Sequence, residues 1–242
     1  MSTPRFLVDS ESLAHATAVL SGAELHHLRV RRLRPGNELI LSDGGGHARR
    51  GILVALDHRQ ALVRFLSTAA TVQGPALHLV LAQAMLKGDL SDLVIEKATE
   101  LGVSGIVFFA SERAIARGCS DRRARWLRVA RSAAKQSQRN TIPEVSGPLQ
   151  FAELLHRPES LRLLFVEAPT APPLRATSEP PDGVLAAVGP PGGFTPAEVE
   201  RAAGAGFRLV GLGPRILRAE TAALAAVTLC QFLWGDLGAG RE

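Results

Sequence analysis

Residues 184–198 read VLAAVGPPGGFTPAE and combine the signals of a buried strand, a turn and a helix start. It opens with a continuous apolar run, which is typical of a strand buried on both faces of a parallel sheet. It ends with Thr195, Pro196 and Glu198, which match the N-cap, the first position and the third position of a helix that begins with a capping box. The stretch therefore predicts a strand, a Gly/Pro loop and a helix in succession.

The same alternation continues on both sides of this stretch. We expect strands at 77–82, 106–110, 161–166 and 208–212, and helices at 89–101, from about 121, and at 150–156, 196–205 and 219–237. Continuous apolar strands separated by helices indicate an α/β fold whose parallel sheet is covered on both faces. In the helix that begins near residue 121, the expected apolar face consists of Leu127, Ala130 and Ala134.

The first seventy residues have a different pattern of apolar runs and turn residues. Short strands are expected at 5–8, 38–41, 50–56 and 61–66, with one short helix near 23–31. Breakers such as Pro35-Gly36-Asn37 separate them, and short strands at this spacing predict a small barrel or sandwich. The rhythm changes after Gly74-Pro75, so the domain boundary is expected near residues 70–75.

A second strand-to-helix loop lies in residues 208–222, which read RLVGLGPRILRAETA. Open parallel sheets bind ligands at such loops. This loop lacks the third glycine of a dinucleotide fingerprint, and the chain contains no GxxxxGK[ST], GxSxG or HExxH. Rossmann cofactor, P-loop, serine hydrolase and zinc protease sites are therefore unsupported, and no metal is expected. Judged alone, the first loop, residues 189–194, is equally compatible with a tight turn that binds nothing.

Positive charge is concentrated in one segment. The chain carries a net charge of +5, yet nine basic residues stand against one acidic residue between positions 113 and 139. The basic residues are Arg113, Arg117, Arg122, Arg123, Arg125, Arg128, Arg131, Lys135 and Arg139. Clustered guanidinium groups suit phosphate and favour a nucleic-acid partner. The alternative is a solvated helix face in an arginine-rich chain.

The remaining composition indicates a cytoplasmic protein. Cys119 and Cys230 are far apart and fit neither a disulfide framework nor a metal motif. No apolar stretch is long enough to cross a bilayer, and the first residues do not look like a secretory signal.

An ordered set of segments carries a family resemblance. It comprises residues 87–89, 96–102, 111–113, 136–140, 189–194 and 212–222. Together they closely resemble the RsmE family of 16S ribosomal RNA (uracil-N3) methyltransferases, which belongs to the SPOUT superfamily. Residues 26–32 and the turn at Asp43-Gly44 also look like the N-terminal barrel of that family.

The resemblance implies a fold, a cofactor and partners. Residues 1–72 would form a PUA-like RNA-binding β-barrel, and residues 73–242 a SPOUT α/β domain with a trefoil knot. The protein would act as a homodimer on 16S ribosomal RNA or the small ribosomal subunit, with S-adenosylmethionine as cofactor. By analogy, the cofactor pocket would contain Gly189, Gly192, Gly193, Leu212, Gly213, Pro214, Ile216 and Leu217.

The chemistry of uracil methylation suggests further roles. The methyl donor is already activated, so the protein mainly supplies orientation and charge stabilisation. We expect Arg218 or Arg215 to stabilise the developing uracil anion, with Glu220 as a weaker candidate for the base. Glu220 could equally favour only the N-terminus of the last helix.

RNA recognition must lie away from the reacting atom, because N3 is on the Watson–Crick edge and the base has to leave its stack. The expected RNA contacts are Arg5, Arg29, Arg31, Arg32, Arg113, Arg128, Lys135, Arg139 and Asn140.

The chain departs from the family pattern at two positions. Pro191 stands where the family usually has Glu, and Ala219 stands where it usually has Thr. If the enzyme is active, neither that Glu nor that Thr is indispensable for its activity. Two alternatives stay open: a non-catalytic RNA-binding relative acting in ribosome assembly, and a nucleotide-binding α/β enzyme with a small substrate. In the last helix, Leu224, Val227 and Trp234 fit either a dimer interface or the core.

Overall fold

The computed structural model describes residues 3–66, 70–71, 77–114, 122–168 and 170–238, and it divides into two compact units. The first consists of Met1–Gly74 together with Ala134–Ile142, and the second of Pro75–Ala133 and Pro143–Glu242. The expected boundary between residues 72 and 73 lies outside the described residues. The sequence did not predict that residues 134–142 belong with the N-terminal unit.

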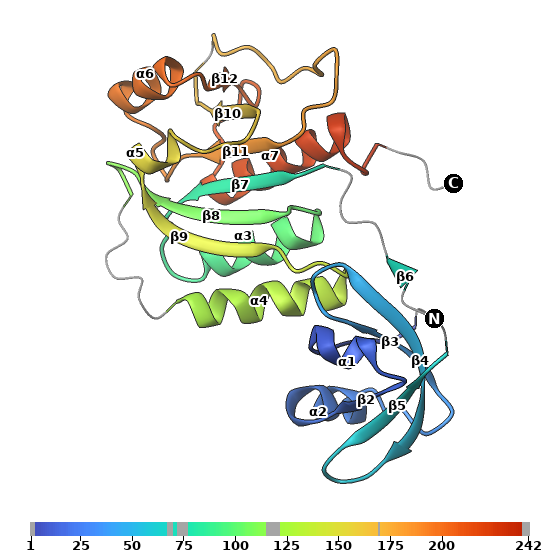
Figure 1. Ribbon diagram of the computed structural model, residues 1–242. Helices are drawn as coiled ribbons and strands as arrows, with labels where there is room; N and C mark the ends of the chain where they lie inside the picture. The colour runs from blue at the N-terminus through green and yellow to red at the C-terminus, as the bar shows by residue number, and fades with distance from the viewer. Residues whose placement is uncertain (1–2, 67–69, 72–76, 115–121, 169, 239–242) are drawn as a thin grey trace. The chain divides into compact units, whose positions relative to one another are not determined.

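The first unit is built on a mixed six-stranded sheet (Figure 1). Its strands are β1 (Arg5–Leu7), β2 (Thr17–Leu20), β3 (Glu38–Ser42), β4 (His47–Leu56), β5 (Ala61–Phe65) and β6 (Ala70–Thr71). The order is β1-β3-β4-β5-β2, with β6 on β4, and only β1 and β3 are parallel. Within the described residues β1 and β2 are not paired, so the sheet is a half-barrel and not the closed barrel or the sandwich that the sequence predicts.

Two helices cover the apolar side of this sheet. The helices are α1 (Ser10–Ala14) and α2 (Gly22–Val30). Leu13, Leu25 and Leu28 pack with Phe6 and Leu39 in one buried cluster. The expected helix near 23–31 is confirmed as α2, whereas α1 and β2 were not predicted because each offers only one or two inward apolar residues.

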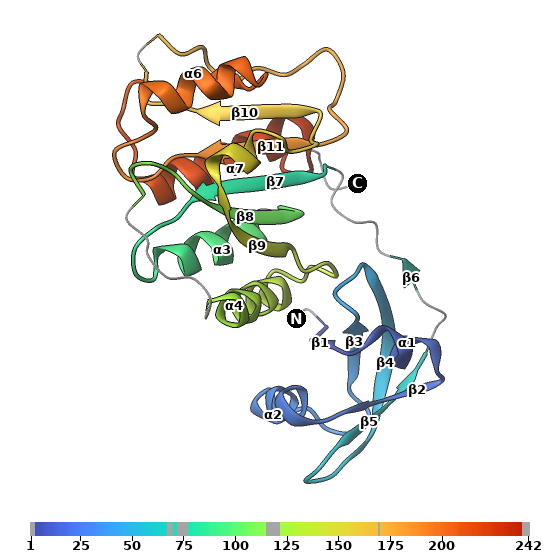
Figure 2. The same ribbon diagram turned by 60° about the vertical axis from the view of Figure 1, so that its left-hand side comes forward.

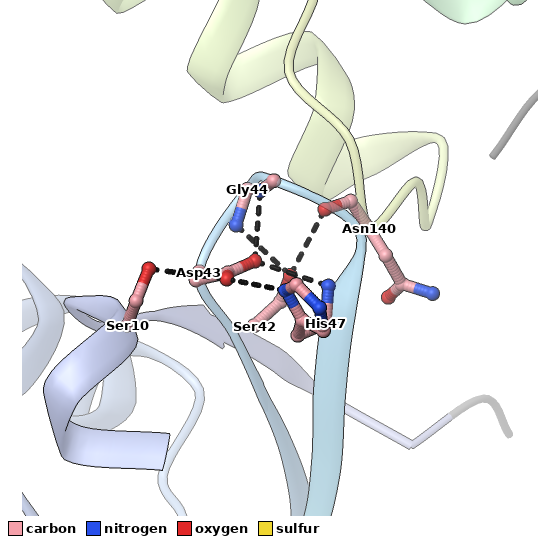
Figure 3. A network of polar contacts seen from close by, with 7 residues as sticks. Ser10, Ser42, Asp43, Gly44, His47 and Asn140 are labelled. Atoms are coloured by element: carbon pink, nitrogen blue, oxygen red, sulfur yellow. Dashed lines mark hydrogen bonds and ion pairs between the residues drawn. The ribbon is translucent and has the colours of Figure 1, made fainter. Parts of the chain in front are cut away.

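The segment 139–142 is bonded to the turn between β3 and β4 (Figure 3). The Asn140 carbonyl accepts from Ser42 Oγ at 3.1 Å and from the Gly46 amide at 3.2 Å. The Ile142 amide donates to the Gly44 carbonyl at 2.8 Å. These bonds explain why this short segment belongs with the first unit.

Asp43 organises the same turn, and its side chain is only 5% exposed. It accepts from Ser10 Oγ at 3.1 Å, from the Gly45 amide at 2.8 Å and from the His47 amide at 3.1 Å, and its Oδ2 lies 2.9 Å from His47 Nδ1 (Figure 3). Burial alone raises the pKa of the Asp43 carboxyl, but these hydrogen bonds outweigh burial and bring the pKa below its ordinary value.

We expect Asp43→Asn to lower the free energy of unfolding by about 1–2 kcal/mol at pH 7, because a charged acceptor is lost. The lowered pKa means that the stabilisation is present above the ordinary value of 3.8 and is lost as the pH falls through the folded-state pKa. Urea unfolding at pH 7 and pH 3 should therefore show a difference between the variant and the unaltered protein that shrinks in acid. A difference that stays constant with pH would contradict this role.

The second unit contains the predicted parallel sheet, which is confirmed. Its strands are β7 (Leu79–Ala84), β8 (Gly105–Ala110), β9 (Glu144–Gln150), β10 (Leu161–Phe165), β11 (Val184–Val188) and β12 (Arg208–Val210). The order is β12-β10-β11-β7-β8-β9, and every pair is parallel. The buried strands β7, β8 and β11 match the continuous apolar runs of the sequence.

Helices cover both faces of this sheet (Figures 1 and 2). They are α3 (Leu90–Glu100), α4 (Arg123–Gln136), α5 (Phe151–Leu154), α6 (Pro196–Gly204) and α7 (Ala219–Trp234). On one face, α5 and α6 pack against alternate residues of the strands, among them Phe109 and Leu185. On the other, α7 contacts β7, β11 and α3. Among the described residues, none of the helices has both the length and the apolar character needed to span a bilayer.

Helix α4 buries a different residue from those expected. Trp126 is 1% exposed and its ring lies 4.4 Å from that of Phe108, whereas Leu127 is 39% exposed. Ala130 and Ala134 are buried as predicted. The buried face of α4 thus keeps Ala130 and Ala134 but has Trp126 in place of Leu127.

Candidate active site

A cavity of about 640 Å³ opens at the carboxyl edge of the parallel sheet. The loops that follow β8, β10, β11 and β12 line it. Its apolar lining includes Phe165, Val188 and Leu209, and its charged lining consists of Arg113, Glu167, Glu200 and Arg215. A cavity of this size, mostly apolar with a few polar groups, suits a small organic ligand or cofactor.

The loop after β11 has the backbone that its sequence predicts. Gly192 and Gly193 adopt φ values of +92° and +69°, which side-chain-bearing residues rarely adopt. The Gly193 amide donates to the Pro190 carbonyl at 2.9 Å and closes a tight turn. Both glycines and Gly189 line the cavity, as expected, whereas Pro191 is exposed and is not part of the lining. The departure from the family at position 191 therefore does not fill the cavity.

The capping box that follows this loop is confirmed. The Glu198 amide donates to Thr195 Oγ1 at 3.2 Å, and the Thr195 amide donates to Glu198 Oε2 at 2.9 Å. Pro196 occupies the start of α6. The loop is thus held at its helical end by reciprocal side-chain bonds.

Gln83 holds the other end of the loop and was not predicted. It is fully buried on β7, and its Nε2 donates to the Gly189 carbonyl at 3.3 Å and to the Ala84 carbonyl at 3.1 Å. A buried side-chain amide on the sheet that donates to the carbonyl of a loop residue fixes that loop to the sheet.

Some residues of the loop after β12 line the cavity and others do not. Leu212, Gly213 and Leu217 line the cavity as expected. Pro214 and Ile216 are not part of the lining, and Ile216 is 85% exposed, so their side chains do not form the cavity wall, and their contact with the cofactor stays a prediction. An irregular loop has no repeating side-chain direction, so its sequence could not show which residues point inward.

Of the three predicted catalytic residues, only Arg215 lines the cavity. Arg218 is the exposed N-cap residue of α7, and Glu220 lies in the first turn of that helix. Ala219 does line the cavity, so the position where the family usually has Thr faces the ligand space.

Comparisons with known proteins agree with this geometry. Residues 73–231 match the model of an RNA methyltransferase domain, and residues 20–66 match an RNA methyltransferase PUA domain. A ribosomal RNA small subunit methyltransferase E from Synechocystis is 37% identical over 230 residues, which cover 92% of this chain and 75% of the relative. The chain belongs to the ribosomal RNA small subunit methyltransferase E family.

Solved structures of similar proteins contain the cofactor. The family member from Neisseria gonorrhoeae, bound to S-adenosylmethionine, is 36% identical, has a TM-score of 0.88 and is matched over 98% of this chain and 100% of its own. A methyltransferase from Legionella pneumophila in complex with S-adenosylmethionine is 30% identical, with a TM-score of 0.87 and coverage of 98% and 100%.

The methyltransferase cavity also contains residues that sequence reasoning missed. Glu167, Thr170 and Ala171 lie in the loop after β10, and Arg113 follows β8. The signal that could have found the β10 loop is its place at the carboxyl end of a parallel strand, like the other two loops. Arg113 was expected among the RNA contacts, but its Nη1 donates to the Gly192 carbonyl at 2.6 Å.

Three of the expected RNA contacts are engaged within the first unit of the methyltransferase. Asn140 is 6% exposed, and its Oδ1 accepts from Arg5 Nη1. Burial lowers the pKa of the Arg5 guanidinium. Lys135 forms an ion pair with Glu24, and both side chains are about four-fifths buried, at 21% and 18% exposure. These positions argue against direct phosphate contact by Arg5, Lys135 or Asn140.

The other expected contacts are more accessible. Arg29 donates to the Asp57 carbonyl at 2.7 Å, and Arg139 to Thr141 Oγ1 at 3.1 Å. Arg31 Nε donates to His27 Nε2 at 3.0 Å. Burial, followed by the charges of Arg31 and Lys135, lowers the pKa of His27, which favours the neutral ring that can accept this bond. Arg32 and Arg128 are exposed and form no ion pair within the described residues.

Proposed function

We propose that the protein transfers a methyl group from S-adenosylmethionine to N3 of a uridine in 16S ribosomal RNA. The observation that carries the proposal is the cavity formed by the glycine loops after β11 and β12. Its volume and its mixed lining fit an adenosine with a charged amino-acid tail. The cofactor found in the relatives from N. gonorrhoeae and L. pneumophila supports the same ligand.

The residues of this chain would bind, orient and neutralise charge. When bound, S-adenosylmethionine supplies a methyl group on a positively charged sulfur. Gly192 and Gly193 let the backbone approach the ligand, and Gln83 keeps Gly189 in place. Arg215 is the predicted catalytic cation that remains at the cavity, where it can stabilise the anionic uracil oxygens. Arg218 and Glu220 have no place in this proposal.

Titration calorimetry with S-adenosylmethionine, followed by radiolabel transfer to small ribosomal subunits that lack the modification, tests the function. We expect cofactor binding and labelling of a single uridine. Binding without transfer would favour the non-catalytic RNA-binding relative, and transfer to another RNA would overturn the substrate.

RNA contact is proposed for the exposed arginines, chiefly Arg32 and Arg128. Each phosphate contact releases counterions, so Arg128→Ala should lower the slope of log affinity against log salt by about 1. Arg125→Ala is the matched control on the same helix, because Arg125 is already paired with Asp92 at 2.5 Å and Asp89 at 2.6 Å. Filter binding over a salt series measures both slopes, and an equal change in the two variants would remove Arg128 from the interface.

A homodimer is proposed through the end of α7 and the residues after it. Leu229, Phe232 and Leu237 are 37%, 62% and 48% exposed. The face named from the sequence is a different one, because Val227 is fully buried in the core. Exposed apolar side chains grouped in this way favour a protein interface.

Phe232→Asp should convert the dimer to a monomer in sedimentation equilibrium, because a charge would be buried at the interface. Val30→Asp is the control, since Val30 is an apolar residue with 65% exposure on α2. A dimer that persists in Phe232→Asp would place the interface elsewhere.

A trefoil knot and a cytoplasmic location complete the proposal. The knot is supported by the path of the chain, because β12 lies outside β10 whereas α7, which follows β12, packs on β11 and β7. Residues 211–218 connect the two and lie against the loop after β10, where the Gly211 amide donates to the Pro172 carbonyl at 2.9 Å. The location follows from a ribosomal RNA substrate.

A further inference from the structure

Glu198 carries a buried carboxylate beside the cavity. It lies on α6 with no exposed surface. A carboxylate removed from water is costly unless hydrogen bonds satisfy its oxygens. The groups that donate hydrogen bonds to the Glu198 carboxylate therefore identify the segments that it holds in place.

The two oxygens of Glu198 hold two different segments. Oε2 accepts from the Thr195 amide at 2.9 Å, which is the local capping box of α6. Oε1 accepts from the Glu112 amide at 3.0 Å, and Glu112 belongs to the loop after β8, 86 positions away in the chain. The second bond has no part in starting the helix, so it ties the β8 loop to the helix that follows the cofactor loop.

The loop after β8, which is hydrogen-bonded to Glu198, places Arg113 at the cavity. Arg113 directly follows Glu112, lines the cavity and donates from Nη1 to the Gly192 carbonyl at 2.6 Å. The Ala114 amide donates to the Ser111 carbonyl at 2.9 Å, which closes the turn around Arg113. A guanidinium has five N–H donors, and the bond to Gly192 leaves others for a substrate.

We propose that Glu198 is a positioning residue that fixes Arg113 at the cavity, where Arg113 donates to a uracil oxygen during methyl transfer. The inference rests on the proposed function. Transfer forms the bond between N3 and the methyl carbon and breaks the carbon–sulfur bond, whose electron pair stays on sulfur, while the N3 proton passes to water. As that proton leaves, negative charge spreads over the uracil oxygens, and a fixed cation beside them lowers the barrier.

Glu198→Gln separates the two bonds of the carboxylate. Glutamine also forms capping boxes, so its side-chain oxygen can still accept the hydrogen bond from the Thr195 amide. Its NH₂ group cannot accept a hydrogen bond, so the Glu112 amide loses its partner. Glu153→Gln is the matched control, because Glu153 forms the capping box of α5, accepts from the Gln150 amide at 2.6 Å and does not line the cavity.

Hydrogen exchange of the Glu112 amide tests the tether without any ligand. We expect the amide to exchange at least about tenfold faster in Glu198→Gln and to be unchanged in Glu153→Gln, because a lost hydrogen bond lets the loop open locally. Unchanged exchange in Glu198→Gln would overturn the tether.

The rate of single-turnover methyl transfer with saturating cofactor tests whether the bond between Glu198 and the Glu112 amide positions Arg113 for the reaction. Arg113→Ala should slow the step about 100-fold, as expected for a lost donor to a developing anion, and Arg113→Lys should recover part of the rate. Glu198→Gln should slow it about tenfold, with the dissociation constant for S-adenosylmethionine changed less than about twofold, and should add nothing to Arg113→Ala, because both act through one guanidinium.

Additive losses in the double variant, or an unchanged rate in Arg113→Ala, would overturn the positioning role. Absence of transfer by the unaltered protein would instead overturn the proposed function, and the role of Arg113 with it. The exchange of the Glu112 amide distinguishes that failure from the loss of the tether itself.

Discussion

Gly192→Val should weaken binding of S-adenosylmethionine at least about 100-fold, which corresponds to about 2.7 kcal/mol. Gly192 adopts a φ of +92°, and a β-branched residue is strongly disfavoured there. The loop would relax by turning away from the left-handed region. That change would displace Gly193 from the lining and remove the carbonyl that accepts from Arg113. Titration calorimetry measures the loss directly.

Gly36→Val is the control for backbone strain alone. Gly36 has a φ of +96°, and an added Cβ there would meet nothing within 4 Å, as is also true at Gly192. Both variants should therefore lose similar stability in thermal unfolding, whereas only Gly192→Val should lose the cofactor. Equal cofactor affinity in the two variants would mean that the loop after β11 does not form the binding site.

The parts of the fold that could be predicted are those with strong local signals. The strand Val184–Val188 is an uninterrupted apolar run, and the helix after it begins with a complete capping box. Strand β9 was missed because its sequence, EVSGPLQ, has few apolar residues and contains Gly and Pro. It forms because it can pair with β8 at the edge of the sheet, which is a tertiary effect.

The candidate site was predicted to the level of loops but not of side chains. Strand-to-helix loops at a sheet edge follow from topology, and the family resemblance then assigned Gly192 and Leu212 within those loops to the pocket that they line. The exposure of Ile216 and the inward position of Glu167 depend on irregular backbone. The count of basic residues could not show that Lys135 is paired with Glu24, because the two are 111 positions apart.

Gly147→Ala should destabilise the second unit by about 4 kcal/mol or more, among the largest effects of single substitutions. A Cβ at Gly147 would lie 2.2 Å from the Phe108 carbonyl oxygen and 3.0 Å from the Phe108 carbonyl carbon and amide nitrogen, at a φ of +102°. These are backbone atoms of β8, so no side-chain rotation relieves the overlap. The strands β8 and β9 would have to separate, and the buried Phe108, which packs on Trp126, would lose its environment.

Gly105→Ala shows whether the effect comes from the close approach or from any methyl group in this strand pair. Gly105 also lies in the ladder between β8 and β9, but its Cβ would be 3.5 Å from Val80 Cγ2 and 3.7 Å from the Glu144 carbonyl oxygen, which are ordinary contacts. We expect it to change the free energy of unfolding by about 1 kcal/mol or less. If urea unfolding gave the same small change for Gly147→Ala, the backbones of β8 and β9 could move apart at this point at little cost in free energy. The edge of the sheet would then be more flexible than its packing indicates.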